Sequence, residues 1–109
     1  MKISLKLSAD LAEVLANALM QISTTGGGHA LLLYYVLFEI NLKLRKRLIE
    51  GRDKFKIQLT PAEVQALLLG LQGGIIEPID DWSVNEYIRL SNELNERLTN
   101  HQKVFRWVG

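Results

Sequence analysis

The sequence contains no cysteine, which excludes disulfide bonds, thiolate catalysis and cysteine-ligated zinc. It also lacks a long hydrophobic run. The longest one covers residues 30–38 and ends at Glu39, whereas a membrane-spanning helix needs about 20 apolar residues. Lys6, Asp10 and Glu13 interrupt every apolar stretch near the amino terminus, so no secretion signal is expected. These absences predict a cytoplasmic protein that has no membrane partner.

Neither sign of charge is in large excess, because the formal net charge of the whole chain is only +1. The distribution is uneven, however. Residues 43–56 hold seven basic and two acidic side chains, a net charge of +5, between mildly acidic flanks. Such a block suits an anionic partner such as nucleic acid. The alternative interpretation is a solvated face, in which the cations at 43–47 offset the negative end of a helix dipole.

Residue sets that could carry catalysis are missing as well. Nucleophilic catalysis needs a nucleophile, a base and an orienting group, and no such pattern is visible. His29 and His101 fall near predicted helix ends, where capping or surface positions are expected. Glu77, Asp80 and Asp81 could gather a hard cation, but such a cluster before a helix more often complements the helix dipole. We therefore expect no enzyme activity, no metal site and no cofactor.

What the chain does contain is an internal repeat. Residues 2–19 align with residues 54–71 at a constant offset of 52 positions and without a gap. The same offset continues through further pairs: Tyr35 and Tyr87, Val36 and Ile88, Leu42 and Leu94, and Arg45 and Arg97. The repeat predicts one domain, residues 1–109, built from the pseudo-repeats 1–52 and 53–109.

Each half opens with a short alternation of polar and apolar residues, at 2–7 and at 54–59. This period of two predicts a strand with one buried face. Ser8 and Thr60 then stand at the N-cap of an amphipathic helix, and Thr60 forms a capping box with Glu63. Glycines end these helices, at 26–28 in the first half and at 73–74 in the second, and another helix follows in each half. The expected fold is α+β, with two short antiparallel strands packed against about four helices.

The helix expected from His29 to about Glu50 is apolar on two nearly opposite sides. One stripe consists of Leu33, Leu37, Ile40, Leu44 and Leu48, and the other of Leu31, Tyr35, Phe38, Leu42 and Ile49. Such a helix is covered on both sides, either within its own domain or by a second copy of the chain. One hypothesis is therefore a homodimer or another homo-oligomeric interaction or assembly module, with its interface at Tyr35, Phe38, Leu42, Phe105 and Trp107.

Two strands alone are marginally stable, so they are expected to pair with each other beneath the helices. Their outward side chains would be Lys2, Ser4, Lys6, Lys54, Lys56 and Gln58. These lysines could bind an anionic partner, or they could serve only to block unwanted strand pairing.

The order of strand, Ser/Thr cap, helix, glycine turn and second helix resembles the ribbon-helix-helix family of DNA-binding proteins. Residues 2–11 carry this pattern in the first half, and 83–89, with Ser83 and Glu86 as a capping box, are similar to that family's entry into its second helix. The resemblance implies a shared ribbon whose six outward residues enter the major groove. It also implies that backbone amides near Ser83 and Val84 hold a phosphate. The first hypothesis is accordingly a small non-catalytic DNA-binding protein.

Overall fold

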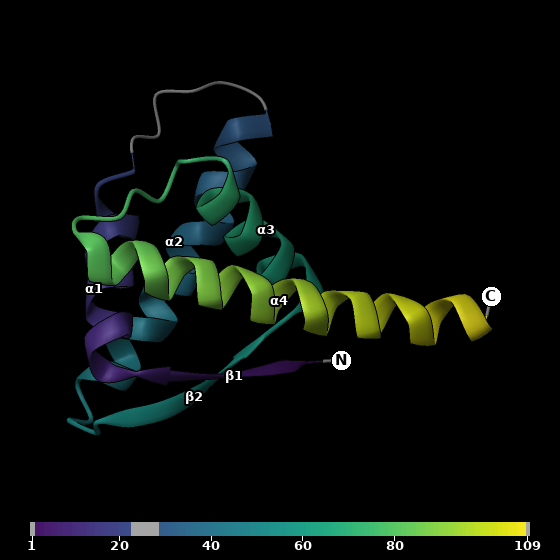
Figure 1. Ribbon diagram of the computed structural model, residues 1–109, viewed down its shortest axis with the longest axis horizontal. Coiled ribbons are helices and arrows are strands. Elements are labelled where there is room, and N and C mark those ends of the chain that lie inside the picture. Colours follow the sequence, from purple (N-terminus) through teal and green to yellow (C-terminus); the bar gives the residue numbers. More distant parts are fainter. Residues whose placement is uncertain (1, 23–28, 109) are drawn as a thin grey trace.

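The computed structural model describes the backbone of residues 2–22 and 29–108 and the side chains of residues 2–22 and 32–100. The predicted glycine turn at 26–28 lies outside the described residues. The described elements are, in order, β1 (Ile3–Ser8), α1 (Ala9–Met20), α2 (His29–Leu48), β2 (Lys54–Leu59), α3 (Pro61–Gln72) and α4 (Asp81–Val108) (Figure 1). The predicted α+β class is confirmed.

The spacing of the elements follows the offset found in the sequence. α1 and α3 begin and end 52 residues apart, and α2 and α4 begin 52 residues apart. That the halves arose by duplication stays a prediction.

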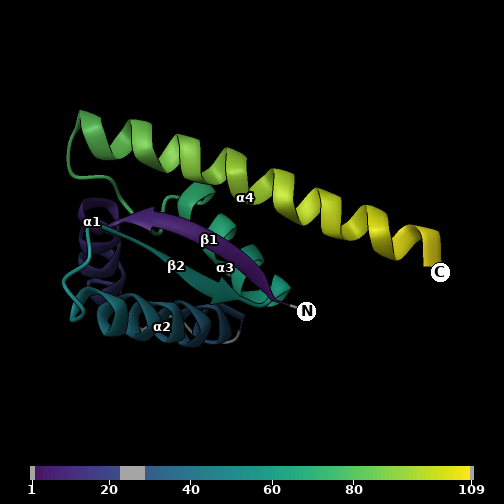
Figure 2. The ribbon, with the colours of Figure 1, turned by 90° about the horizontal axis from the view of Figure 1, so that it is seen from below.

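β1 and β2 form a two-stranded antiparallel ribbon, as predicted. In its register Ile3 lies opposite Leu59, Leu5 opposite Ile57 and Leu7 opposite Phe55. All six of these side chains are buried, because the alternation of the strand directs them toward the helices. Seen from below, the ribbon crosses the molecule in front of α1 and α3, with α2 along one side and α4 along the other (Figure 2).

The first helix of each half begins where its cap predicts. The Ser8 hydroxyl accepts a hydrogen bond from the Leu11 N–H at 3.2 Å. In the second half the Thr60 hydroxyl accepts from the Glu63 N–H at 3.2 Å, and the Glu63 carboxylate accepts from the Thr60 N–H at 2.9 Å. These contacts confirm the capping box, and they satisfy N–H groups that the first turn of a helix leaves without a backbone partner.

The start of α4 corrects the prediction. The helix begins at Asp81 rather than Val84, because Asp80 takes the N-cap position. Its carboxylate accepts from the Ser83 N–H at 2.8 Å, and the Ser83 hydroxyl accepts from the Asp80 N–H at 3.0 Å. The predicted box of Ser83 with Glu86 is therefore wrong by three positions. Aspartate caps a helix as well as serine does, and Ser83 takes the reciprocal place usually held by Glu.

The core lies between the ribbon and the helices. α2 contributes one stripe, with Leu37, Ile40 and Leu44 fully buried. Its other stripe is exposed at Tyr35 and Phe38, and further along the same side. Of the two alternatives, coverage of both sides by the domain itself is not found among the described residues, and coverage by a second copy stays a prediction. Within the described chain, no helix is both long and hydrophobic enough to cross a membrane.

Candidate nucleic-acid interface

The outer face of the ribbon is defined by the even-numbered positions of the two strands and by Lys2, which precedes β1. Lys6 lies opposite Lys56, Ser4 opposite Gln58 and Ser8 opposite Lys54. The four lysines and Gln58 are exposed, whereas Ser4 and Ser8 are half-buried. The structure thus brings all six sequence-predicted residues together on one surface, which none of the described elements covers (Figure 2).

The charges on this outer face are unbalanced. Lys6 and Lys56 form a directly opposed cross-strand pair, an arrangement of like charges that destabilises a sheet. The face carries no carboxylate. None of its four lysines belongs to an ion pair among the described residues. An anion bound across the ribbon would relieve this repulsion.

A groove continues the positive surface beyond the ribbon. It runs between β2 and the carboxyl-terminal part of α2, and its lining is formed by Lys2, Lys43, Lys46, Arg47, Glu50, Ile57 and Gln58. Sequence reasoning left the cations of α2 between an anionic partner and a helix-dipole role, and it missed their place beside the ribbon. The signal was the +5 block itself, which continues from α2 into β2.

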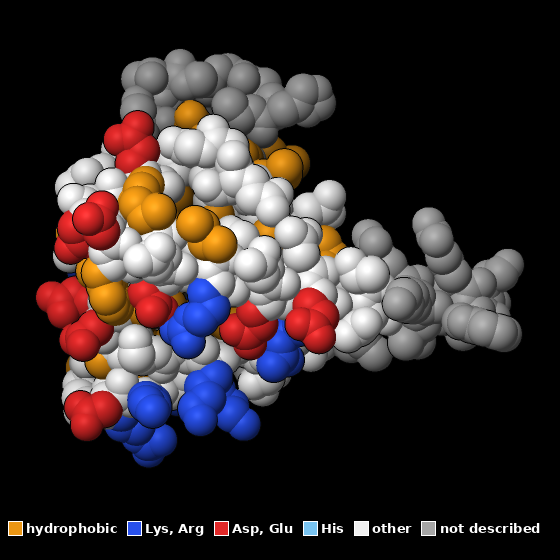
Figure 3. All heavy atoms as spheres, viewed as in Figure 1, with side chains coloured by type: hydrophobic (Ala, Val, Ile, Leu, Met, Phe, Trp, Pro, Cys, Tyr) orange, Lys and Arg blue, Asp and Glu red, His pale blue; other side chains and the backbone are white. Residues whose placement is uncertain are grey.

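The distribution of charge is visible on the surface. In Figure 3 many of the Lys and Arg side chains gather along the lower edge, over the two strands. Others lie over α4 among Asp and Glu side chains, which also follow the left side.

Lys43 links α2 to β2 and to the start of α3. Its ammonium group donates to the Gln58 carbonyl at 3.0 Å and to the Glu63 carboxylate at 2.8 Å. Burial acts to raise the pKa of Glu63, but hydrogen bonds from Lys43 and the Thr60 N–H and the positive charge of Lys43 outweigh it. The pKa therefore lies below its ordinary value, and Glu63 stays ionised beside the groove.

The phosphate site implied at the start of α4 is wrong. The Ser83 N–H already donates to the Asp80 carboxylate, and the Val84 N–H donates to the Asp80 carbonyl at 3.0 Å. Ser83 is also fully buried. With these amides occupied and the negative charges of Asp80 and Asp81 beside them, this helix start does not suit a phosphate.

Other sequence candidates do not assemble into a site in the described part of the chain. Glu77, Asp80 and Asp81 do not form a metal-binding group there, and Asp80 serves as a helix cap. The side chains of His29 and His101 lie outside the described residues. Those of Phe105 and Trp107 do as well, so the predicted interface is described only at Tyr35, Phe38 and Leu42.

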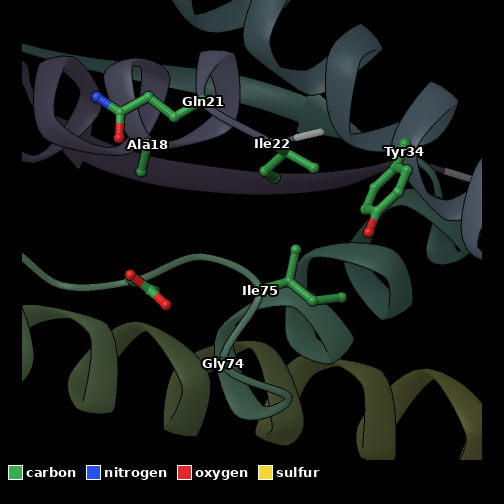
Figure 4. A pocket seen from close by; sticks show the side chains of 7 residues that line it. Ala18, Gln21, Ile22, Tyr34, Gly74 and Ile75 are labelled. Atoms are coloured by element: carbon green, nitrogen blue, oxygen red, sulfur yellow. The ribbon is translucent and has the colours of Figure 1, made fainter. Parts of the chain in front are cut away.

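A separate pocket lies between the end of α1, the start of α2 and the connection from α3 to α4 (Figure 4). Its described lining consists of Ala18, Gln21, Ile22, Tyr34, Gly74, Ile75 and Glu77. These residues include one carboxylate and one phenol but no pair of nucleophile and base, so they suggest no reaction.

Comparisons with models of protein families, with curated proteins and with solved structures found no match to this chain.

Proposed function

We propose that this is a non-catalytic, cytoplasmic protein that binds double-stranded DNA through the outer face of its ribbon. The observation that carries the proposal is the opposed pair Lys6 and Lys56 at the middle of an uncovered, carboxylate-free face. A two-stranded ribbon fits the major groove of B-form DNA. Phosphates on either side of that groove would neutralise charges that the fold leaves without a partner.

The residues of this face divide into two roles. Lysine ammonium groups can donate to phosphates or to the acceptor atoms of guanine, whereas the Gln58 amide can pair with adenine through two hydrogen bonds. Lys46 and Arg47, in the groove beside β2, would contact phosphates only. Since most of these groups are lysines, we expect electrostatic attraction to supply most of the affinity and sequence preference to be modest.

The proposal predicts a strong dependence of binding on salt. Fluorescence anisotropy with a labelled duplex measures affinity over a range of salt concentrations. The double variant K6Q/K56Q is expected to bind at least about tenfold more weakly at low salt and to reduce the log–log salt slope by about two. Its folding should be intact, because the substitutions remove a repulsion on an exposed face.

The matched control is R89Q/R97Q, which removes the same charge from exposed positions on α4. It should leave affinity nearly unchanged. Equal weakening by both double variants would show attraction to net charge alone and would overturn the ribbon as the site. Binding of wild-type protein that is the same at low and high salt would also overturn the proposal.

A further inference from the structure

The outward side of α2 carries an apolar stripe. Tyr35, Phe38 and Leu42 are 60%, 54% and 47% exposed, and Ile49, just past the helix, is 86% exposed. Their spacing of three, four and seven residues keeps them on one side of a helix over about 21 Å. Monomeric proteins rarely leave such a patch open to water.

In α4 three residues that correspond to this stripe are covered by the rest of the protein. Tyr87, Leu90 and Leu94 stand 52 positions after Tyr35, Phe38 and Leu42. In α4 the three side chains are only 5%, 3% and 0% exposed, because they pack into the core. α2 reaches the core through the opposite side instead, so the corresponding stripe has no cover among the described residues.

We propose that a second copy of this chain covers the stripe, with α2 packed antiparallel against α2 around a two-fold axis near Leu42. The charges beside the stripe favour this occupant. Glu39 and Lys46 are seven residues apart, so they lie on the same flank of the helix, on either side of Leu42. Both are exposed, and neither belongs to an ion pair within the described residues.

A two-fold axis makes this pattern self-complementary. It brings Glu39 of each copy to Lys46 of the other, so two ion pairs form at symmetry-related places. A parallel two-fold arrangement would instead place this flank of the two copies on opposite sides of the interface, so Glu39 of one copy could not reach Lys46 of the other. The aromatic residues Tyr35 and Phe38 provide the large apolar anchors that are enriched at interfaces. The stripe shares no residue with the outer face of the ribbon, and association is measured without DNA, so this inference and the proposed function can fail separately. Lys46 belongs both to the basic groove and to the proposed ion pairs.

Light scattering coupled to size-exclusion chromatography tests the association. The wild-type protein should have the mass of a dimer at micromolar concentration. L42K should be monomeric, with a dimer dissociation constant at least about a hundredfold higher. I88K is the matched control, because Ile88 is 56% exposed on α4. It should remain dimeric. A monomeric wild-type protein, or equal loss in both variants, would overturn the proposal. Circular dichroism checks that each variant is folded.

A charge exchange tests the orientation. E39K alone and K46E alone should each dimerise more weakly than wild type, because each homodimer then sets like charges together. The double variant E39K/K46E should regain dimerisation, and so should an equimolar mixture of the two single variants. If neither restores the dimer, the antiparallel pairing is wrong.

Discussion

α2 and α4 occupy the same place in the two halves of the chain, yet they turn opposite sides to the core. α2 buries Leu37, Ile40 and Leu44. The corresponding positions of α4, 52 residues later, are Arg89, Asn92 and Glu96, which are exposed. Two helices that follow matching strands and caps can therefore pack differently, because the caps fix where a helix begins but not which side it buries.

The same contrast extends to charge. Near its end α2 carries Lys43, Lys46 and Arg47, which line the groove beside β2. The corresponding residues of α4 are Asn95, Leu98 and Thr99, which are uncharged. Each half of the chain thus gives the outer face two lysines, whereas among the described residues the basic groove that flanks the ribbon lies on the α2 side.

The most direct test of this difference in packing is to truncate the corresponding leucine in each helix. L94A should lower the free energy of unfolding by about 2–5 kcal/mol, since Leu94 is fully buried and its loss leaves a cavity. L42A should change the stability of the dilute monomer by less than about 0.5 kcal/mol, since Leu42 is exposed. Urea unfolding of both variants measures the difference. Equal costs would mean that the two helices bury the same side.

Sequence reasoning reached the antiparallel ribbon and the first helix of each half because these depend on local signals. Alternation over 2–7 and 54–59 identifies the buried face, and Ser8 and Thr60 mark the helix starts. The packing of α2 could not be predicted from the sequence. Its periodicity reveals two apolar stripes, but which one meets the core depends on the neighbouring helices.

The candidate site was predictable to a similar extent. Its lysines follow from strand alternation, whereas the groove beside them does not. Lys43 meets Gln58 across 15 residues of sequence, a contact that only the packed fold creates. At α4 the sequence predicted Ser83 as the cap, whereas the structure places Asp80 at the N-cap.

A smaller effect is expected at Glu63, whose ion pair with Lys43 exists in one half only. The corresponding positions are Leu11 and Asn95. E63Q removes the charge but keeps a side chain that can complete the capping box. We expect it to lower the free energy of unfolding by about 1 kcal/mol near neutral pH, because Lys43 is partly exposed and its pairing is screened by solvent.

The pH dependence of this loss has a definite sign. Because the folded protein holds the pKa of Glu63 below the ordinary value of 4.5, the carboxylate contributes stability above that value. The contribution disappears as the pH falls through the lowered pKa. Urea unfolding of wild type and E63Q should therefore differ near neutral pH and converge in acid. A difference that grows in acid would contradict the assignment.

The smallest expected change in stability concerns Tyr87 and its counterpart in the repeat, Tyr35. The Tyr87 hydroxyl is buried without a hydrogen-bond partner among the described residues. Burial raises the pKa of Tyr87, and the nearby charge of Asp80 raises it further. Y87F removes a buried polar group that has no partner, so the free energy of unfolding should stay constant or rise by up to about 1 kcal/mol.

Y35F is the matched control, because Tyr35 is the corresponding residue and is exposed on α2. Its stability should match that of wild type to within about 0.5 kcal/mol. Thermal unfolding of both variants in dilute solution measures the two changes. If Y87F loses stability while Y35F does not, the Tyr87 hydroxyl has a hydrogen-bond partner in solution. The buried side of α4 would then hold a polar contact that the corresponding, exposed side of α2 lacks.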